Sequence, residues 1–293
     1  MNMKKASSTL ISRLRHPGLP ILALGWLVLL SLLPLELFGS AVRARKQQKP
    51  RTAEEVVERA LLAYGGRPAI YVIQRNGIYR ANLKLFTPAG SQEGRSVTKF
   101  IRKPKLAEDL VTIELELPDL KYTITSDGKK VWSTQNGLPH TPTEQEIRGF
   151  RGSHEHHYEA LLRYKENGAR LEYSGSNKIG TLDLDQIRLT SPDGIDTIYE
   201  ISRRTGRIIY VNYEEKSAAN GQPVKYRLYF KDFRVIQNTI IPYEIQVFQD
   251  GKLIEERRIV EAAFNVQMEE KIFQTKEPGT GSAAKPEEAK EPK

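Results

Sequence analysis

The chain has 293 residues, no cysteine and a formal net charge of +9. The lack of cysteine excludes disulfide bonds, cysteine nucleophiles, thiolate metal sites and a lipid attached to an N-terminal cysteine. Much of the positive charge flanks an apolar run near the N-terminus, which is typical of membrane topology. Acidic and basic residues are interspersed over the rest of the chain, so a nucleic-acid interface is not expected.

Residues 1–44 have the order of a targeting segment. Basic and polar residues come first, the uncharged run from Ile21 to Leu33 follows, and helix breakers and small residues end the segment. This order is typical of a secretory signal peptide. A retained N-terminal membrane anchor is the alternative, although the run is short of the roughly 20 apolar residues that span a membrane. We expect an exported protein, in the periplasm or anchored in the inner membrane facing the periplasm, with residues 45–51 as a basic linker.

Residues 52–64 are predicted to form the first helix of the fold. Thr52 and Glu55 have the spacing of a capping box. Apolar residues then recur at intervals of three and four up to Tyr64, which places them on one side of a helix. The pair Gly65-Gly66 is predicted to end the helix, because glycine accepts the left-handed conformation that follows a helix C-terminus.

From Ile70 to Val266 the apolar residues recur with a period of two. The pattern is clearest in residues 111–117, 120–124 and 241–247. Such alternation predicts strands with one buried and one solvated face. Turn signals such as Asp127-Gly128 and Asn220-Gly221 separate the strands, several of them at hairpin spacing. We predict an α+β fold with a large curved antiparallel sheet, an incomplete β-barrel of about 10–12 strands covered by helices.

Residues 142–167 interrupt the strands. Thr143 and Glu146 repeat the capping-box spacing, and residues 155–166 are predicted to form a helix that ends at Asn167-Gly168. The sequence shows no alternation of strand and helix, so a parallel sheet is not expected. We expect the two helices to cover the apolar face of the sheet.

The last residues, 276–293, are predicted to be a disordered tail. They contain no apolar residue larger than alanine. Such a segment cannot bury enough apolar surface to offset the entropy lost on ordering. The predicted folded domain therefore spans residues 52–275.

A series of short motifs occurs in a fixed order through this domain. They are Ala60 to Gly66, Asp127-Gly128, Trp132, Thr205-Gly206-Arg207, Tyr229, Asp232, Phe233, Arg234, Pro242 and Phe273. Their order and spacing resemble the outer-membrane lipoprotein-sorting family, the LolA/LolB-like proteins. The resemblance implies an incomplete barrel curled around helices, with an apolar cavity that binds lipid or lipoprotein acyl chains. It implies neither catalysis nor a cofactor, and the missing cysteine argues against a lipidated outer-membrane receptor.

The densest group of possible metal ligands is His154-Glu155-His156-His157. A helical zinc site needs histidines four apart, as in His-Glu-x-x-His, whereas these three are one, two and three apart. We interpret the group as a polar, solvated first turn of the second helix. Weak metal binding by His154, His156 and His157 is the alternative, and a catalytic metal centre is the least favoured.

Other signatures of catalysis are missing from the sequence. There is neither a Gly-x-Ser-x-Gly elbow nor a glycine-rich phosphate loop between a strand and a helix. Paired carboxylates such as Asp183 and Asp185 alternate along predicted strands, so we expect them on the solvated face. The sequence therefore does not predict an enzyme.

The apolar face of the alternating strands is the favoured candidate for a ligand site. If the helices leave a gap against this face, its side chains line a lipid pocket, and if they do not, the same side chains form the core. Trp132 is predicted either to fill the core or to contact a ligand. The candidate lining residues are Val111, Ile113, Leu115, Tyr122, Ile124, Trp132, Ile241, Tyr243 and Ile245.

Three functions remain open from the sequence. The leading hypothesis is a binding protein for a lipid or a lipoprotein acyl chain, used in sorting or transport. The alternative is a structural or assembly factor of the envelope that acts through protein partners and, if the N-terminal segment is retained, through the membrane. The third is a metal-binding protein that uses the cluster from His154 to His157.

Overall fold

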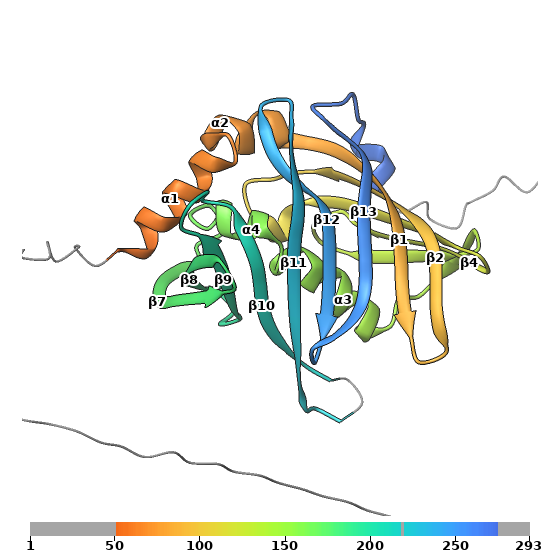
Figure 1. Ribbon diagram of the computed structural model, residues 1–293. Helices are drawn as coiled ribbons and strands as arrows, with labels where there is room; N and C mark the ends of the chain where they lie inside the picture. Colours follow the sequence, from red (N-terminus) through yellow and green to blue (C-terminus); the bar gives the residue numbers. More distant parts are fainter. Residues whose placement is uncertain (1–50, 218–219, 275–293) are drawn as a thin grey trace, which may run out of the picture. The chain divides into compact units, whose positions relative to one another are not determined.

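The computed structural model describes residues 51–217 and 220–274. The predicted targeting segment, most of the linker and the predicted tail lie outside the described residues. In the described part, thirteen strands form one antiparallel sheet in the order β6-β5-β4-β3-β2-β1-β13-β12-β11-β10-β9-β8-β7 (Figure 1). The chain thus runs from the middle of the sheet to one edge, crosses to the other edge through helices, and returns to the middle. The predicted curved antiparallel sheet is confirmed, with slightly more strands than expected.

The first half of the sheet runs outward from its centre. The strands pair in sequence order, because short turns join each strand to the next. Apolar residues alternate in this half as expected, and Ile113 lies directly opposite Ile124. The strands are β1 (Asn76–Thr87), β2 (Gly90–Ile101), β3 (Leu110–Leu117), β4 (Leu120–Ser126), β5 (Val131–Gln135) and β6 (Leu138–His140).

The second half begins at the opposite edge and returns to the centre, where β13 pairs with β1. Residues with positive φ occupy its hairpin turns, among them Asn238 and Asp250. Asparagine and aspartate tolerate this conformation better than other residues that carry a Cβ. The strands are β7 (Arg170–Ile179), β8 (Leu182–Thr190), β9 (Asp196–Ser202), β10 (Ile208–Lys216), β11 (Pro223–Ile236), β12 (Thr239–Gln249) and β13 (Lys252–Phe264).

The helix α1 (Ala53–Ala63) confirms the first predicted helix. The Thr52 hydroxyl accepts a hydrogen bond from the Glu55 backbone at 3.2 Å, and the Glu55 carboxylate accepts one from the Thr52 backbone at 3.1 Å. Gly65 follows with φ of +101°, and a Cβ there would lie 2.5 Å from the Asn238 carbonyl oxygen. The short helix α2 (Gly66–Tyr71) and the 3-10 turn η1 (Ile73–Arg75) then lead into β1.

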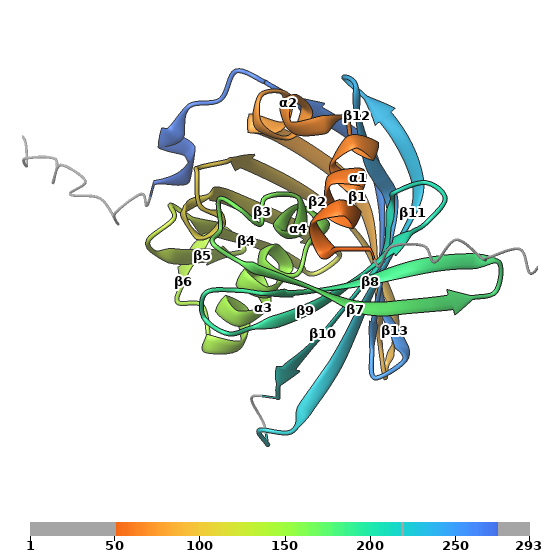
Figure 2. The ribbon, with the colours of Figure 1, turned by 90° about the vertical axis from the view of Figure 1, so that its left-hand side faces the viewer.

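The segment between the two edges forms α3 (Glu144–Glu155) and α4 (Tyr158–Leu162). The capping box at Thr143 and Glu146 starts α3, and the predicted single helix over 155–166 is wrong. His157 takes an extended conformation, so the chain breaks there before α4 begins. Both helices lie inside the curve of the sheet (Figure 2). No helix of residues 51–217 and 220–274 has the length and apolar character needed to cross a membrane.

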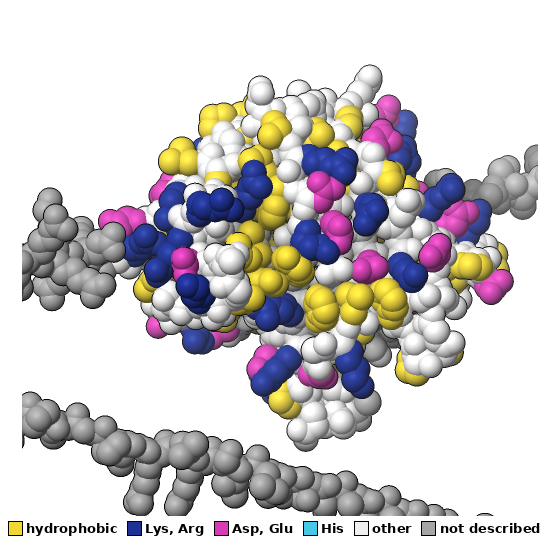
Figure 3. Space-filling view, viewed as in Figure 1, with side chains coloured by type: hydrophobic (Ala, Val, Ile, Leu, Met, Phe, Trp, Pro, Cys, Tyr) yellow, Lys and Arg dark blue, Asp and Glu magenta, His cyan; other side chains and the backbone are white. Residues whose placement is uncertain are grey.

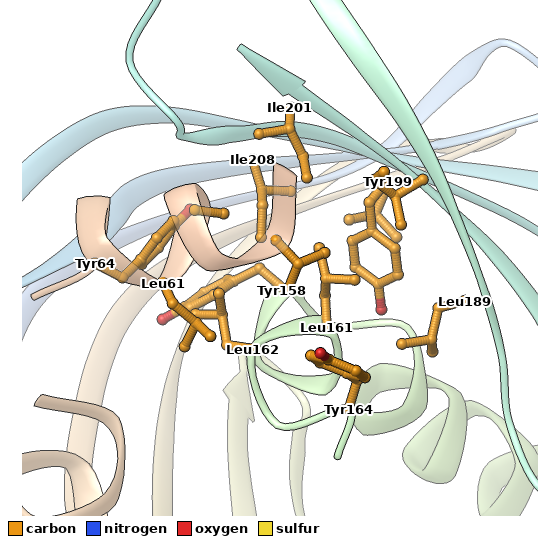
Figure 4. Close-up of a cluster of buried hydrophobic side chains, with 14 of the residues drawn as sticks. Leu61, Tyr64, Tyr158, Leu161, Leu162, Tyr164, Leu189, Tyr199, Ile201 and Ile208 are labelled. Carbon is orange, nitrogen blue, oxygen red and sulfur yellow. The ribbon is translucent and has the colours of Figure 1, made fainter. Parts of the chain in front are cut away.

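Two apolar clusters fill the space between the sheet and the helices. The first joins α1 and α4 to strands β8 to β12, and Tyr64 of α1 stacks on Tyr158 of α4 at 5.3 Å (Figure 4). The second joins Phe150 of α3 to strands β1 to β4, β12 and β13. Two further 3-10 turns, η2 (Leu106–Glu108) and η3 (Glu270–Phe273), lie beside β3, the first before it in the chain and the second packed against it.

Candidate functional site

A pocket of about 100 Å³ lies between the sheet and the α3–α4 segment. The side of the pocket formed by the sheet is mostly apolar. The side formed by α3 and α4 carries His154, His157 and Glu159 instead. The apolar side chains that line the sheet side are Ala81, Phe100, Val111, Ile113, Ile245 and Ile259.

An ion pair at one end of the pocket fastens α4 to the end of β2. Arg102, the residue after β2, pairs with Glu159 of α4, and their side chains are only 6% and 14% exposed. Arg102 also donates to the Gln74 side chain at 3.0 Å. Burial raises the pKa of Glu159, but the guanidinium of Arg102 outweighs this effect, so the pKa lies below its ordinary value. The pair is therefore ionised although it is buried.

A second buried ion pair fastens the residue after α4 to the start of β3. Arg163 donates to both carboxylate oxygens of Asp109, at 2.6 and 3.1 Å. Their side chains are 2% and 5% exposed. Two-point contacts of this kind fix the orientation of both groups as well as their distance. The α4 segment is thus tied to the first half of the sheet by two ion pairs and to the second half by the first apolar cluster.

The three neighbouring histidines do not converge on one point. His156 is buried, its Nδ1 lies 2.7 Å from the Thr197 hydroxyl, and its ring stacks on Tyr213 at 3.7 Å. His154 and His157 face the pocket instead. The solvated first turn expected from the sequence is wrong, because these residues form the end of α3 and the break before α4, with His156 buried and the others half-buried. Among the described residues, no group of three or more His, Cys, Asp and Glu side chains is arranged to hold a metal ion.

Burial also sets the charge of these histidines. It lowers the pKa of His156 and of His157 to about 4, and it lowers the pKa of His154. A protonated imidazole would have to be held in a poorly solvated site, which is the physical cause of the shifts. All three rings are therefore neutral at pH 7.

Three of the predicted lining residues reach the pocket: Val111, Ile113 and Ile245. Directly opposite residues of paired strands share a face. The register therefore places Ile124 beside Ile113, and Tyr122 beside Leu115, on the same side of the sheet.

The other predicted lining residues lie elsewhere. Tyr122, Ile124, Ile241 and Tyr243 pack in the second apolar cluster, which also holds Val111 and Ile113, but they do not line the pocket themselves. Trp132 lies opposite Thr125 and so points to the other face from Ile124, which excludes it from the lining.

Sequence reasoning missed the charged residues of the site. Arg102, Asp109, Glu159 and Arg163 look like solvated charges in the sequence, since their partners are far along the chain. Arg257 is a further lining residue, and it stands directly opposite Ile245 on β13. The sequence offers one indication: Arg257 is two residues before Ile259 on the same strand, so the two side chains point to the same, inner face.

Asp185 corrects another expectation. Its side chain is 0% exposed, whereas the sequence placed it on the solvated face of a strand. Arg51, Arg59 and Arg203 surround the carboxylate at 2.7 to 3.0 Å, and the Tyr173 hydroxyl donates to it at 3.1 Å. The cluster ties the start of α1 to β8 and β9, and it is a structural contact.

A second, larger hollow of about 910 Å³ lies along strands β9 to β12. Tyr210 alternates with the buried Val211, so Tyr210 points to the outer face of the sheet. Tyr229 stacks on Tyr210 at 4.6 Å, and the guanidinium of Arg227 lies 4.1 Å from the centre of the Tyr210 ring. Arg227 also pairs with Glu200 at 2.7 Å. This outer groove combines aromatic surface with charges that are already paired.

Comparison with known proteins supports the fold. Neither the protein-family models nor the curated proteins gave a match. Among solved structures, the chain is similar to a putative outer-membrane lipoprotein-sorting protein domain from Vibrio parahaemolyticus, with 13% identity, a TM-score of 0.52, and coverage of 75% of this chain and 97% of that one. A LolA-superfamily protein from Nitrosomonas europaea has 12% identity, a TM-score of 0.53, and coverage of 77% and 99%.

A DUF1329-family protein from Desulfovibrio piger gives similar values, with 10% identity, a TM-score of 0.53, and coverage of 76% and 97%. At such low identities the likeness shows the fold alone. The chain therefore shares the open, curved fold of these three structures, one of which is a LolA-superfamily protein, and the fold that the resemblance implied is confirmed.

Proposed function

We propose that the protein is a non-catalytic binding protein of the cell envelope that holds an acyl chain of a lipid or lipoprotein against the inner face of its sheet. The observation that carries the proposal is the apolar wall of the pocket, where Val111, Ile113 and Ile259 face a helical segment instead of another sheet. Burying an acyl chain there would contribute about 0.8 kcal/mol per methylene. The LolA-like fold and the name of the Vibrio parahaemolyticus domain are consistent with such a ligand.

Binding of a whole acyl chain requires the pocket to enlarge. Its volume of about 100 Å³ is well below the roughly 300–1,000 Å³ of pockets that enclose small ligands. The α3–α4 segment occupies the space that a chain would need. Between its connections to β6 and β7, its hydrogen bonds and ion pairs to the rest of the fold involve side chains. We therefore propose that this segment moves outward when the ligand enters, which breaks the ion pairs of Arg102 with Glu159 and of Arg163 with Asp109.

Native mass spectrometry tests the proposal directly. We expect purified protein to carry a lipid, and the delipidated protein to take up a fluorescent fatty acid. Ile113→Asp places a charge on the pocket wall and should abolish uptake, whereas Val260→Asp, at a residue that is 56% exposed, should leave uptake unchanged. Lipid-free protein that takes up no fluorescent acyl chain, or an Ile113→Asp variant that binds like the native protein, would refute the proposal.

The outer groove favours a second candidate function, a structural or assembly factor that contacts another envelope protein. Tyrosine and arginine, which line the groove at Tyr210, Tyr229 and Arg227, are enriched at the energetic centres of protein interfaces. A photoreactive residue at position 229 should then cross-link to one defined protein, and the same residue at position 129, in the exposed turn after β4, should not. Equal cross-linking from both positions would argue against this function.

A further inference from the structure

One end of the fold exposes apolar side chains that no other described element covers. Leu62 of α1 is 75% exposed, Val72 after α2 is 65% exposed, and Val235 near the end of β11 is 67% exposed. Among the other large apolar side chains of the described residues, only Leu138 reaches a similar exposure, at 70%. A single exposed leucine is ordinary, but three such residues on elements at one end of the fold need an explanation, and we call them the apolar patch.

The β11–β12 turn packs on the helices, which brings the elements that carry the three residues to one end of the fold. Thr239, just after the turn, donates to the Tyr64 carbonyl oxygen at 2.9 Å and lies 2.6 Å from the side-chain nitrogen of Gln74. It thereby joins the C-terminus of α1, which carries Leu62, to the residues that follow Val72. Val235 pairs with Ile240, the neighbour of Thr239, so the Val235 side chain points to the outer face of this hairpin whereas Thr239 faces the helices. Figure 1 shows α1, α2 and this turn at one end of the sheet.

Arginines border this patch. Arg207 lies in the β9–β10 turn, and its guanidinium is 5.2 Å from the centre of the Phe233 ring. This turn packs closely on α1, because a Cβ added to Gly206 would lie 3.0 Å from the Arg59 carbonyl oxygen. Arg75 is exposed in η1. Neither Arg75 nor Arg207 forms an ion pair with an acidic side chain of the described residues. Figure 3 shows basic side chains gathered beside apolar ones near this end.

Two more arginines at this end are already paired. Arg67 pairs with Glu58 at 2.5 Å, and Arg234 pairs with Asp232 at 2.6 Å. The patch is therefore apolar at its centre, with two unpaired positive charges at its border.

We propose that this end of the fold rests on the surface of a membrane containing anionic phospholipid, with Leu62, Val72 and Val235 in the interfacial layer and the arginines at the lipid phosphates. Exposed apolar side chains beside basic ones are the combination that binds such a surface. The patch does not overlap the proposed acyl-chain pocket, so the two proposals can fail separately.

The sequence before α1 favours a membrane over a protein as the occupant. Residues 43–51 contain five basic residues and no acidic one, and they join the fold where α1 begins. The uncharged run from Ile21 to Leu33 precedes them. The order along the chain is therefore apolar run, basic segment, α1. If the apolar run is retained and inserted in a bilayer, α1 is held close to that bilayer.

The absence of cysteine makes a direct test possible, because one introduced cysteine gives a single labelling site. Val72→Cys, Val235→Cys and the control Leu138→Cys are labelled in the full chain with a polarity-sensitive fluorophore. With vesicles of phosphatidylglycerol and phosphatidylcholine, we expect labels at 72 and 235 to shift to shorter wavelength and to be quenched several-fold less by iodide. The label at 138 should remain as accessible as in buffer.

A charge-matched pair of variants tests the role of the arginines. In the Val72→Cys background, Arg75→Gln with Arg207→Gln should remove most of the shielding on anionic vesicles. Lys129→Gln with Lys130→Gln, in the exposed β4–β5 turn, changes the net charge equally and should leave the shielding intact.

Three results would overturn the proposal. The first is a label at 72 that is as quenchable as the label at 138 on every vesicle. The second is equal shielding at all three positions, which would indicate non-specific adsorption. The third is shielding without vesicles that grows with protein concentration, which would show that a second copy of the chain covers the patch.

Discussion

Asp185 is a buried carboxylate with four side-chain partners among the described residues. A fully buried carboxylate would normally destabilise a fold, but three arginines and a tyrosine hydroxyl contact this one. The arginines lie two positions before the start of α1, in α1 itself and directly after β9, so one side chain holds together parts of the chain that are far apart in sequence.

Replacing this carboxylate tests its contribution. Asp185→Asn keeps the shape but removes the charge, and we expect the free energy of unfolding to fall by about 2–3 kcal/mol, less than for a fully buried pair because the arginines are about one-third exposed. Urea unfolding at pH 7 measures the change. The exposed neighbour variant Asp183→Asn should change it by less than about 0.5 kcal/mol.

The same cluster predicts a dependence on acid. Burial raises the pKa of Asp185, but hydrogen bonds from the three arginines outweigh it, and the pKa lies below its ordinary value. A lowered pKa in the folded state stabilises the fold above the unfolded value of about 3.9, and this contribution is lost as the pH falls through the lowered pKa. The difference between the native protein and Asp185→Asn should therefore shrink in strong acid, and a difference that stays constant would contradict this account.

His156 is expected to make stability depend on pH in a milder range. Burial lowers its pKa to about 4, whereas the unfolded chain binds the proton with a pKa of about 6.5. Between these values the unfolded state holds more protons, so the free energy of unfolding rises with pH, by at most about 1.4 kcal/mol per pH unit for each such histidine.

His156→Phe keeps the stacking on Tyr213 and should remove this part of the slope. Urea unfolding at several pH values between 4 and 6.5 measures it. Burial raises the pKa of Glu155 and of Glu215, which acts in the opposite direction, so the comparison is between variant and native protein at each pH. Identical slopes for the two proteins would show that His156 does not titrate in this way.

At the scale of elements, the sequence predicted α1 and the alternating strands because their signals are local. The Thr52–Glu55 cap and the apolar stripe of α1 lie within one segment, and apolar residues that recur with a period of two predict the strands. The buried position of His156, next to the break before α4, depends instead on Thr197 and Tyr213, on strands that come 41 and 57 residues later. The charged side of the pocket escaped prediction for the same reason, since Arg163 meets Asp109 across 54 residues.

The ion pair of Arg102 with Glu159 gives a test of how α4 is held. Arg102→Met alone leaves a buried carboxylate without its partner and should cost about 3–5 kcal/mol of unfolding free energy. The double variant Arg102→Met with Glu159→Leu removes both charges and should recover most of that loss. If α4 must leave the sheet when a ligand enters, the double variant should also take up a fluorescent fatty acid faster in stopped-flow measurements. Unchanged uptake would show that this pair does not limit entry.

At the scale of the whole described fold, two apolar clusters share one sheet. Ile245 belongs to the first cluster, while Ile241 and Tyr243, on the same strand, belong to the second. The strand β12 therefore contributes to both clusters. The pairing of β1 with β13 makes the two halves of the sheet continuous. Loss of packing in one cluster should weaken the other, because the hydrogen-bonded strands between them cannot separate independently.

Leu161→Ala measures this coupling, because Leu161 is fully buried in the first cluster. It should lower the free energy of unfolding by about 2–5 kcal/mol. Trp132 lies on β5, in the half of the sheet that carries the second cluster, although its side chain points to the outer face. It reports on that half alone once Trp26→Phe removes the other tryptophan. We expect its fluorescence and the circular dichroism to shift together in urea, while Leu62→Ala, at an exposed site of α1, shifts neither. A fluorescence midpoint that stays in place while the circular dichroism moves would mean that the two halves unfold separately.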